Sequence, residues 1–96
     1  RFALDDAPTR QYTTTRADGD IARIDVAWWE RHYGVEGEGW EWHQGRLRWK
    51  RDKRRTASLE ALGWRLTFVT WDDVVVHSDE TLERIAIAYH ERRRFH

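Results

Sequence analysis

The chain has 96 residues, of which 40% are hydrophobic and 35% are charged, with 17 Lys/Arg, 17 Asp/Glu and no cysteine. This length allows one small domain with a single core, and the absence of cysteine excludes a disulfide framework or a thiolate metal site. No apolar run approaches the ~18–20 residues that a membrane helix needs. We therefore expect a globular, cytoplasmic domain that does not enter a membrane. Because the chain starts at Arg1 rather than at methionine, we also expect it to be the C-terminal part of a longer protein.

The first third of the sequence predicts a β-hairpin followed by a third strand. Residues 1–10 show little periodicity and are expected to be an irregular lead-in. β-branched runs over 11–16 and 21–28 flank the sequence Ala-Asp-Gly-Asp at 17–20, which is typical of a hairpin turn. The segment 32–38 has the composition of a further strand and ends before a glycine.

The rest of the chain predicts two helices separated by a strand. Nothing breaks a helix over 46–62, and Gly63 is a natural residue to follow its last turn. Residues 64–70 alternate and are rich in strand formers. Asp72-Asp73 and the nearby His77 could suggest a metal site, but capping of a short helical turn is the better interpretation of the two acids, and His77 is expected at the surface. A second helix begins near residue 78, and its apolar stripe consists of Leu82, Ile85, Ala86 and Tyr89.

The predicted order is therefore β-β-β-α-β-α. Strands that bracket helices in this way indicate a sheet with helices packed on it, in the α/β or α+β class. Trp64 and Trp71 bracket the apolar strand over 64–70, so we expect both rings in the core.

Two carboxylates on neighbouring strands are the first functional signal. Alternation puts Ala22, Ile24 and Val26 on one face of the second strand and Asp25 on the other. If the second and third strands pair antiparallel, Asp25 and Glu36 lie on the same face, on strands ~4.8 Å apart. Two carboxylates at ~5 Å repel by roughly 3 kcal/mol at an effective dielectric near 20, and a divalent cation removes that cost. Oxygen ligands favour Mg²⁺ or Mn²⁺. The alternative is that the two acids diverge and are solvated or paired with an arginine, Arg23 or Arg31.

A basic segment is the second signal. Residues 46–55 carry seven Lys/Arg and one Asp, whereas the other 86 residues hold ten basic and sixteen acidic side chains. Such a separation suits a surface that binds a polyanion, DNA above all, although a solvated helix face explains the charge run as well. The candidate DNA-binding residues are Arg46, Arg48, Lys50, Arg51, Lys53 and Arg54, with Trp40 and Trp42 as rings that could stack on bases.

The fragments RIDVAW, YGVEGEGWEWHQGR and KRDKRRTASLEALGWRLTFVTWDDV together resemble the very-short-patch-repair (Vsr-like) branch of the PD-(D/E)XK endonuclease superfamily. The resemblance runs from about residue 11 into the last helix. It implies a restriction-endonuclease-like core, here a three-stranded meander plus a fourth strand flanked by helices, and Mg²⁺-dependent hydrolysis or nicking of DNA.

The resemblance also assigns roles to individual residues. It implies that Asp25 and Glu36 are metal ligands, with the backbone carbonyl of residue 37. Glu38 is implied as a second catalytic acid, either a second-metal ligand or an outer acceptor. His43 of the sequence WEWH corresponds to the proposed general base or water-orienting group; the alternative for His43 is a partly buried imidazole between tryptophans.

The sequence departs from the family pattern in ways that keep a second hypothesis open. The first core helix, which usually supplies a further Glu, would lie before Arg1. The lysine that usually follows the third-strand acids is not there, although Lys50 or Lys53 could replace it from the helix, and Gly37 stands where an apolar residue is usual. The alternative function is a catalytically inactive nuclease-fold module for DNA binding or protein interaction, beside an N-terminal domain, for example in a toxin–antitoxin or phage-defence protein.

Overall fold

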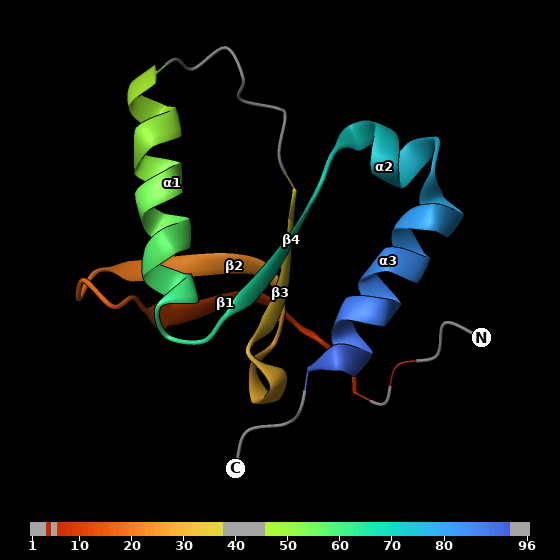
Figure 1. Cartoon of the computed structure of the whole chain (residues 1–96), viewed down its shortest axis with the longest axis horizontal. Helices are drawn as coiled ribbons and strands as arrows, with labels where there is room; N and C mark the ends of the chain where they lie inside the picture. The colour runs from red at the N-terminus through yellow and green to blue at the C-terminus, as the bar shows by residue number, and fades with distance from the viewer. Residues whose placement is uncertain (1–3, 5, 38–45, 93–96) are drawn as a thin grey trace.

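The computed structural model describes residue 4, residues 6–37 and residues 46–92; within 46–52 it describes the helical backbone alone. The elements are, in chain order, β1 (Thr9–Thr15), β2 (Ile21–Trp28), the 3₁₀ turn η1 (Trp29–Arg31), β3 (Tyr33–Gly37), α1 (Arg46–Glu60), β4 (Arg65–Val69), α2 (Trp71–Val75) and α3 (Ser78–Glu91). The predicted order of strands and long helices is confirmed. The described chain is an α+β fold in which α1 and α3 lie on opposite sides of one sheet (Figure 1).

The sheet is mixed and its strands run in the order β1-β2-β3-β4. β1, β2 and β3 form an antiparallel meander, in which Val26 lies opposite Val35 and Trp28 opposite Tyr33. β3 and β4 are parallel, with Glu36 opposite Phe68, and the chain between them passes through α1. Parallel neighbours need such a crossover connection.

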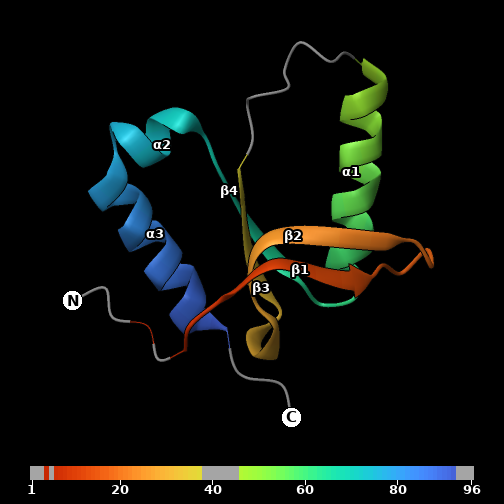
Figure 2. The ribbon, with the colours of Figure 1, turned by 180° about the vertical axis from the view of Figure 1, so that it is seen from behind.

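The predicted hairpin turn is confirmed, and it is attached to α1. The Arg16 N–H donates to the Asp20 carbonyl at 2.7 Å, closing the turn. The Asp18 N–H donates to Ser58 Oγ at 3.0 Å, and Ser58 belongs to the last turn of α1. Figure 2 shows the consequence from behind: the β1–β2 hairpin extends to the α1 side, and α3 lies beyond β3 and β4.

Two apolar clusters hold the helices to the sheet. On the α3 side the buried residues are Trp28, Tyr33, Val35, Val69, Ala88 and Tyr89, with Leu4, Val26 and Ile85 packed against them. On the α1 side they are Ala22, Ile24, Ala27, Leu59 and Trp64, with Tyr12 and Leu66 packed against them. Leu59 is the one side chain of the described part of α1 in this second cluster, so few apolar contacts hold α1 there.

A buried arginine joins the two ends of the described chain. The Arg31 guanidinium lies 3.9 Å from the centre of the Tyr89 ring and donates to the Arg92 carbonyl at 2.8 Å. It also approaches Asp6 Oδ2 at 3.5 Å, and the Tyr89 hydroxyl donates to the same carboxylate oxygen at 3.1 Å. These contacts fasten the segment before β1 to the end of α3.

Three predictions about packing are wrong. The alternation of β2 breaks, since Ile24 and Ala27 both pack on the α1 side while Val26 packs on the α3 side. The break coincides with a distortion in β1, where the residue opposite Asp25, Gln11, has a φ of 54°. Trp71 is 58% exposed and Leu82 is 50% exposed, so neither is a core residue, whereas Trp64 is buried as predicted. Trp71 begins α2, whose described residues are all outside the core.

Candidate functional site

The candidate site lies where β3 ends, on the α1 side of the sheet. A side chain at Gly34 would collide with β2, because a Cβ atom there would lie 2.7 Å from Ile24 Cγ2 and 3.3 Å from the Val26 carbonyl oxygen. The absence of a side chain at this position therefore lets Ile24 and the β2 backbone pack closely against β3. Glu36 lies two residues further along β3 and points to the same side, since its partner is a side chain of α1. The site is thus built from β2, β3 and α1.

Asp25 lies beside the end of β3. The β2–β3 pairing ends with Val26 opposite Val35, so Asp25 precedes the last paired residue of β2 and Glu36 follows the last paired residue of β3. The Gly37 N–H donates to Asp25 Oδ2 at 3.0 Å, which brings the carboxylate to the residue that follows Glu36. Asp25 is exposed, and within the described part of the chain its second oxygen accepts no hydrogen bond. One oxygen of Asp25 is therefore held by the backbone, beside the chain that carries Glu36.

Glu36 is held by an arginine of α1. Arg55 Nη1 donates to Glu36 Oε1 at 3.0 Å and Arg55 Nη2 donates to Glu36 Oε2 at 2.6 Å. The two side chains are largely buried, with 20% of Arg55 and 12% of Glu36 exposed. Arg55 Nη2 also donates to the carbonyl of Arg23, on β2. A guanidinium that engages both carboxylate oxygens makes one of the stronger ion pairs in proteins.

Sequence reasoning missed this pairing. The sequence predicts Arg23 or Arg31 as the alternative partner of Glu36 and groups Arg55 with the other cations of the helix. The signal was present in the helix period, because Arg55 precedes the core residue Leu59 by four positions and so shares its face. Arg31 is instead committed to the contacts with Tyr89 and Asp6.

Several predicted site residues lie outside the part of the chain whose side chains the structure describes. Glu38, Trp40, Trp42 and His43 lie outside the described residues, and of Arg46, Arg48, Lys50 and Arg51 only the helical backbone is described. Lys53 and Arg54 are exposed on α1, as a DNA-binding role requires. The structure thus brings Asp25 and Glu36 to neighbouring backbone positions, and it leaves the grouping of the other candidates as a prediction.

The described donors match a hard cation in type. Asp25, Glu36 and the Gly37 carbonyl offer oxygen atoms, which Mg²⁺ and Mn²⁺ prefer. Among the described residues there is no group of three or more His, Cys, Asp or Glu that could hold a metal ion. Because Glu38 and His43 are outside that set, the described site amounts to two carboxylates and a backbone carbonyl.

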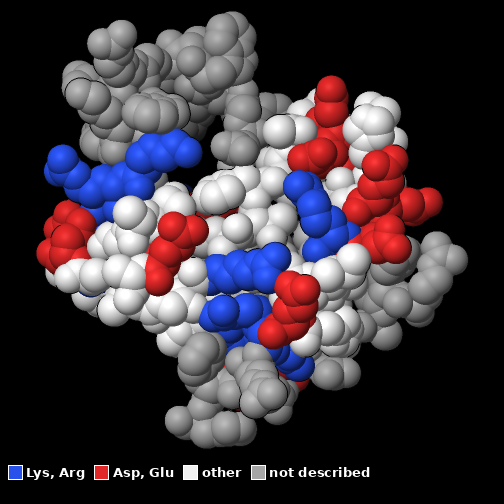
Figure 3. Space-filling model, in the orientation of Figure 1, with Lys and Arg blue, Asp and Glu red and all other residues white. Residues whose placement is uncertain are grey.

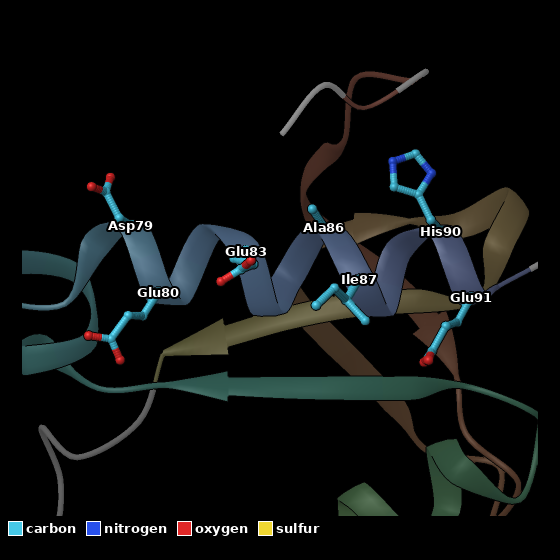
Figure 4. A pocket seen from close by; sticks show the side chains of 7 residues that line it. All are labelled: Asp79, Glu80, Glu83, Ala86, Ile87, His90 and Glu91. Atoms are coloured by element: carbon cyan, nitrogen blue, oxygen red, sulfur yellow. The ribbon is translucent and has the colours of Figure 1, made fainter. Parts of the chain in front are cut away.

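Charged side chains are unevenly distributed over the described surface. Figure 3 shows Lys and Arg over the described part of α1 and also over the centre of the view, whereas Asp and Glu are most frequent over α2 and α3. Because the side chains of 46–52 are outside the described set, the predicted charge separation stays a prediction. A shallow hollow runs along α3, on the far side of the sheet from Glu36, and Figure 4 shows its lining side chains: Asp79, Glu80, Glu83, Ala86, Ile87, His90 and Glu91. No predicted site residue lines this hollow.

Two described acids have a lowered pKa, and both stabilise local structure. The Thr70 N–H donates to Asp73 Oδ2 at 2.8 Å and lowers the pKa of that carboxyl; with the Thr70 hydroxyl this completes a capping box at the start of α2. The N–H of Asp20 similarly lowers the pKa of Asp18 in the hairpin turn. The interpretation of Asp72-Asp73 as a helix cap is therefore confirmed, with Asp73 as the capping acid, and His77 is exposed as expected.

Burial raises the pKa of the Tyr33 hydroxyl, which is 2.7 Å from Thr67 Oγ1 in the neighbouring strand. This pair links β3 to β4 beside the α3-side core.

None of the described helices is long and apolar enough to cross a membrane.

Comparison with known proteins finds relatives without a described function. The chain is 37% identical over 79 residues to two proteins of Mycobacterium tuberculosis, Uncharacterized protein MT2308 of strain CDC 1551 / Oshkosh and Uncharacterized protein Rv2248 of strain H37Rv. The match covers 82% of this chain but only 29% of each relative, so the chain spans less than a third of their length. No family model matches the chain, and no solved structure matches it.

Proposed function

We propose that the chain is a metal-dependent endonuclease-like domain with a restriction-endonuclease-like core, acting on DNA phosphodiester bonds. The observation that carries the proposal is the position of the Asp25 carboxylate at the end of β3, where it accepts a hydrogen bond at 3.0 Å from the N–H of Gly37, the residue that follows Glu36. Support also comes from the topology, an antiparallel meander joined through a helix to a parallel fourth strand. The basic α1 lies against the same side of the sheet as Glu36.

The candidate site residues have the following roles in this proposal. Asp25 and Glu36, with the Gly37 carbonyl, would hold Mg²⁺ or Mn²⁺, which supplies Lewis-acid stabilisation of charge on a phosphate oxygen. The Gly37 N–H orients Asp25 by holding Oδ2, so that Oδ1 is left for a ligand. Lys53 and Arg54 supply positive charge for the DNA backbone. His43 would orient or deprotonate water, and Glu38 would assist, as the family resemblance implies.

Nicking of supercoiled plasmid tests the proposal. The chain is incubated with plasmid and Mn²⁺ beside an Asp25→Asn variant and a control variant, Asp72→Asn, which removes the same charge from exposed α2. We expect nicking by the chain and by Asp72→Asn, and its loss in Asp25→Asn. Equal nicking by all three proteins, or none by any of them, would remove the enzymatic proposal for this chain.

A specific observation favours a second function, a nuclease-fold module that binds DNA without cutting it. The Glu36 carboxylate is already neutralised by Arg55, which satisfies both oxygens without a metal. In that case duplex affinity depends on salt while no strand is cut. Five engaged cations would give a slope of about −4.5 for log affinity against log salt. A slope near zero would exclude the basic helix as a DNA-binding surface.

A further inference from the structure

The Arg55 guanidinium engages the carboxylate that a metal ion would need, that of Glu36. It takes both oxygens of Glu36 and, through Nη2, the carbonyl of Arg23. The pair is mostly shielded from water, since 88% of the Glu36 side chain and 80% of the Arg55 side chain are covered. Lys53 and Arg54, two and one residues earlier in α1, are exposed instead. One cation of the basic helix is thus turned inward onto the predicted metal ligand.

A guanidinium and a divalent cation cannot both neutralise the same buried carboxylate without cost. Each is attracted to Glu36, but at carboxylate distances they would lie within a few ångströms of one another and repel. The repulsion is strongest where water is excluded, as it is around this pair. Binding of a divalent cation at Glu36 therefore requires Arg55 to withdraw from at least one oxygen.

We propose that Arg55 is a built-in competitor for the metal site: it neutralises Glu36 while no divalent cation is bound and has to be displaced for one to bind. The inference rests on the proposed function, because it takes Glu36 as a metal ligand, and it adds a control on that site. The competition also links the site to α1, because Arg55, the residue that the metal displaces, belongs to the helix that carries the exposed cations Lys53 and Arg54.

Reciprocity makes the competition measurable without any catalytic assay. If Arg55 lowers the affinity of the site for a divalent cation, then a divalent cation weakens the hold of Arg55 by the same factor. Removing the guanidinium should therefore tighten metal binding while lowering the melting temperature of the metal-free protein. An arginine that merely orients Glu36 for the metal would have the opposite effect on affinity.

The experiment is a calorimetric titration of the whole chain with Mn²⁺. Arg55→Gln is compared with the unaltered chain and with Arg54→Gln, which removes the same charge one residue away at an exposed position. We expect Arg55→Gln to bind Mn²⁺ about tenfold more tightly, and Arg54→Gln to stay within about twofold. Because loss of the buried pair lowers stability, Arg55→Lys is a second variant: its single ammonium cannot engage both oxygens, so its affinity should lie between those of the chain and Arg55→Gln.

The outcomes separate this inference from the proposed function. The competition would be overturned, and the metal site kept, if the unaltered chain, Arg55→Gln and Arg55→Lys bound Mn²⁺ with equal affinity. Weaker Mn²⁺ binding by the Arg55 variants would also overturn the competition, in favour of an orienting role for Arg55. A gain that survives the added substitution Glu36→Gln would place the bound ion elsewhere and refute the inference. If no variant binds Mn²⁺, the metal site and the inference fail together.

Discussion

Gly34→Ala offers a direct test of how closely β2 packs against β3 at the candidate site. The added Cβ would lie 2.7 Å from Ile24 Cγ2, 3.1 Å from Leu66 Cδ2 and 3.3 Å from the Val26 carbonyl. Ile24 is fully buried, and the carbonyl belongs to the β2 backbone, so neither neighbour can move freely. Overpacking of this kind costs about 1–3 kcal/mol. For a domain of this size, a loss of about 2 kcal/mol corresponds to a fall of roughly 8–16 °C in melting temperature.

The assay is urea unfolding combined with a double-mutant cycle. Ile24→Ala alone leaves a cavity and should cost about 2–5 kcal/mol. In the double variant the new methyl group occupies part of that cavity, so the two costs should be less than additive by about 1 kcal/mol or more. A Gly34→Ala variant as stable as the unaltered chain, or strictly additive costs, would show that the two strands are not in the close contact described.

Two further predictions concern the ends of the fold. Arg31→Met should lower the free energy of unfolding by about 3 kcal/mol, because it leaves the buried partners of the guanidinium unpaired. The control Arg65→Met removes an exposed ion pair with Glu91 and should lower it by less than about 1 kcal/mol. Equal losses of the two variants in urea unfolding would contradict the role of Arg31. The hydrogen bond from the Thr70 N–H lowers the pKa of Asp73 in the folded state. The ionised Asp73 carboxylate therefore contributes to folding stability above the unfolded-state pKa, and this contribution is lost as the pH falls through the folded-state pKa. The melting-temperature difference between the chain and Asp73→Asn should therefore shrink as the pH is lowered from 6 to about 2.5, and a constant difference would refute the capping assignment.

Local signals predicted the elements well because each is fixed within a few residues. The Ala-Asp-Gly-Asp turn over 17–20 and the end of the helix at Gly63, with a φ of 91°, depend on backbone conformations that glycine adopts easily. Acids in the first turn placed α3 correctly, and Asp73 was correctly interpreted as a cap. These features need no information about the rest of the chain.

Tertiary packing was less predictable, because it depends on distant segments. The regular alternation assumed for β2 fails at Asp25, where the opposite strand is distorted at Gln11. The position of Trp71 at the end of an apolar strand predicts a core residue, but Trp71 begins a short helix outside the clusters. The pairing of Arg55 with Glu36 is not predicted, because Arg55 is one of seven Lys/Arg in ten residues and only the helical period relates it to the core residue Leu59.

The central claim is that Asp25 and Glu36 share one divalent cation. Anomalous X-ray scattering from crystals of the chain soaked in Mn²⁺ tests it directly. The account predicts an anomalous peak in contact with a carboxylate oxygen of each of the two residues, and its loss in crystals of Asp25→Asn. Crystals that take up Mn²⁺ elsewhere, or that show Glu36 still paired with Arg55 and no peak beside Asp25 at saturating Mn²⁺, would contradict it.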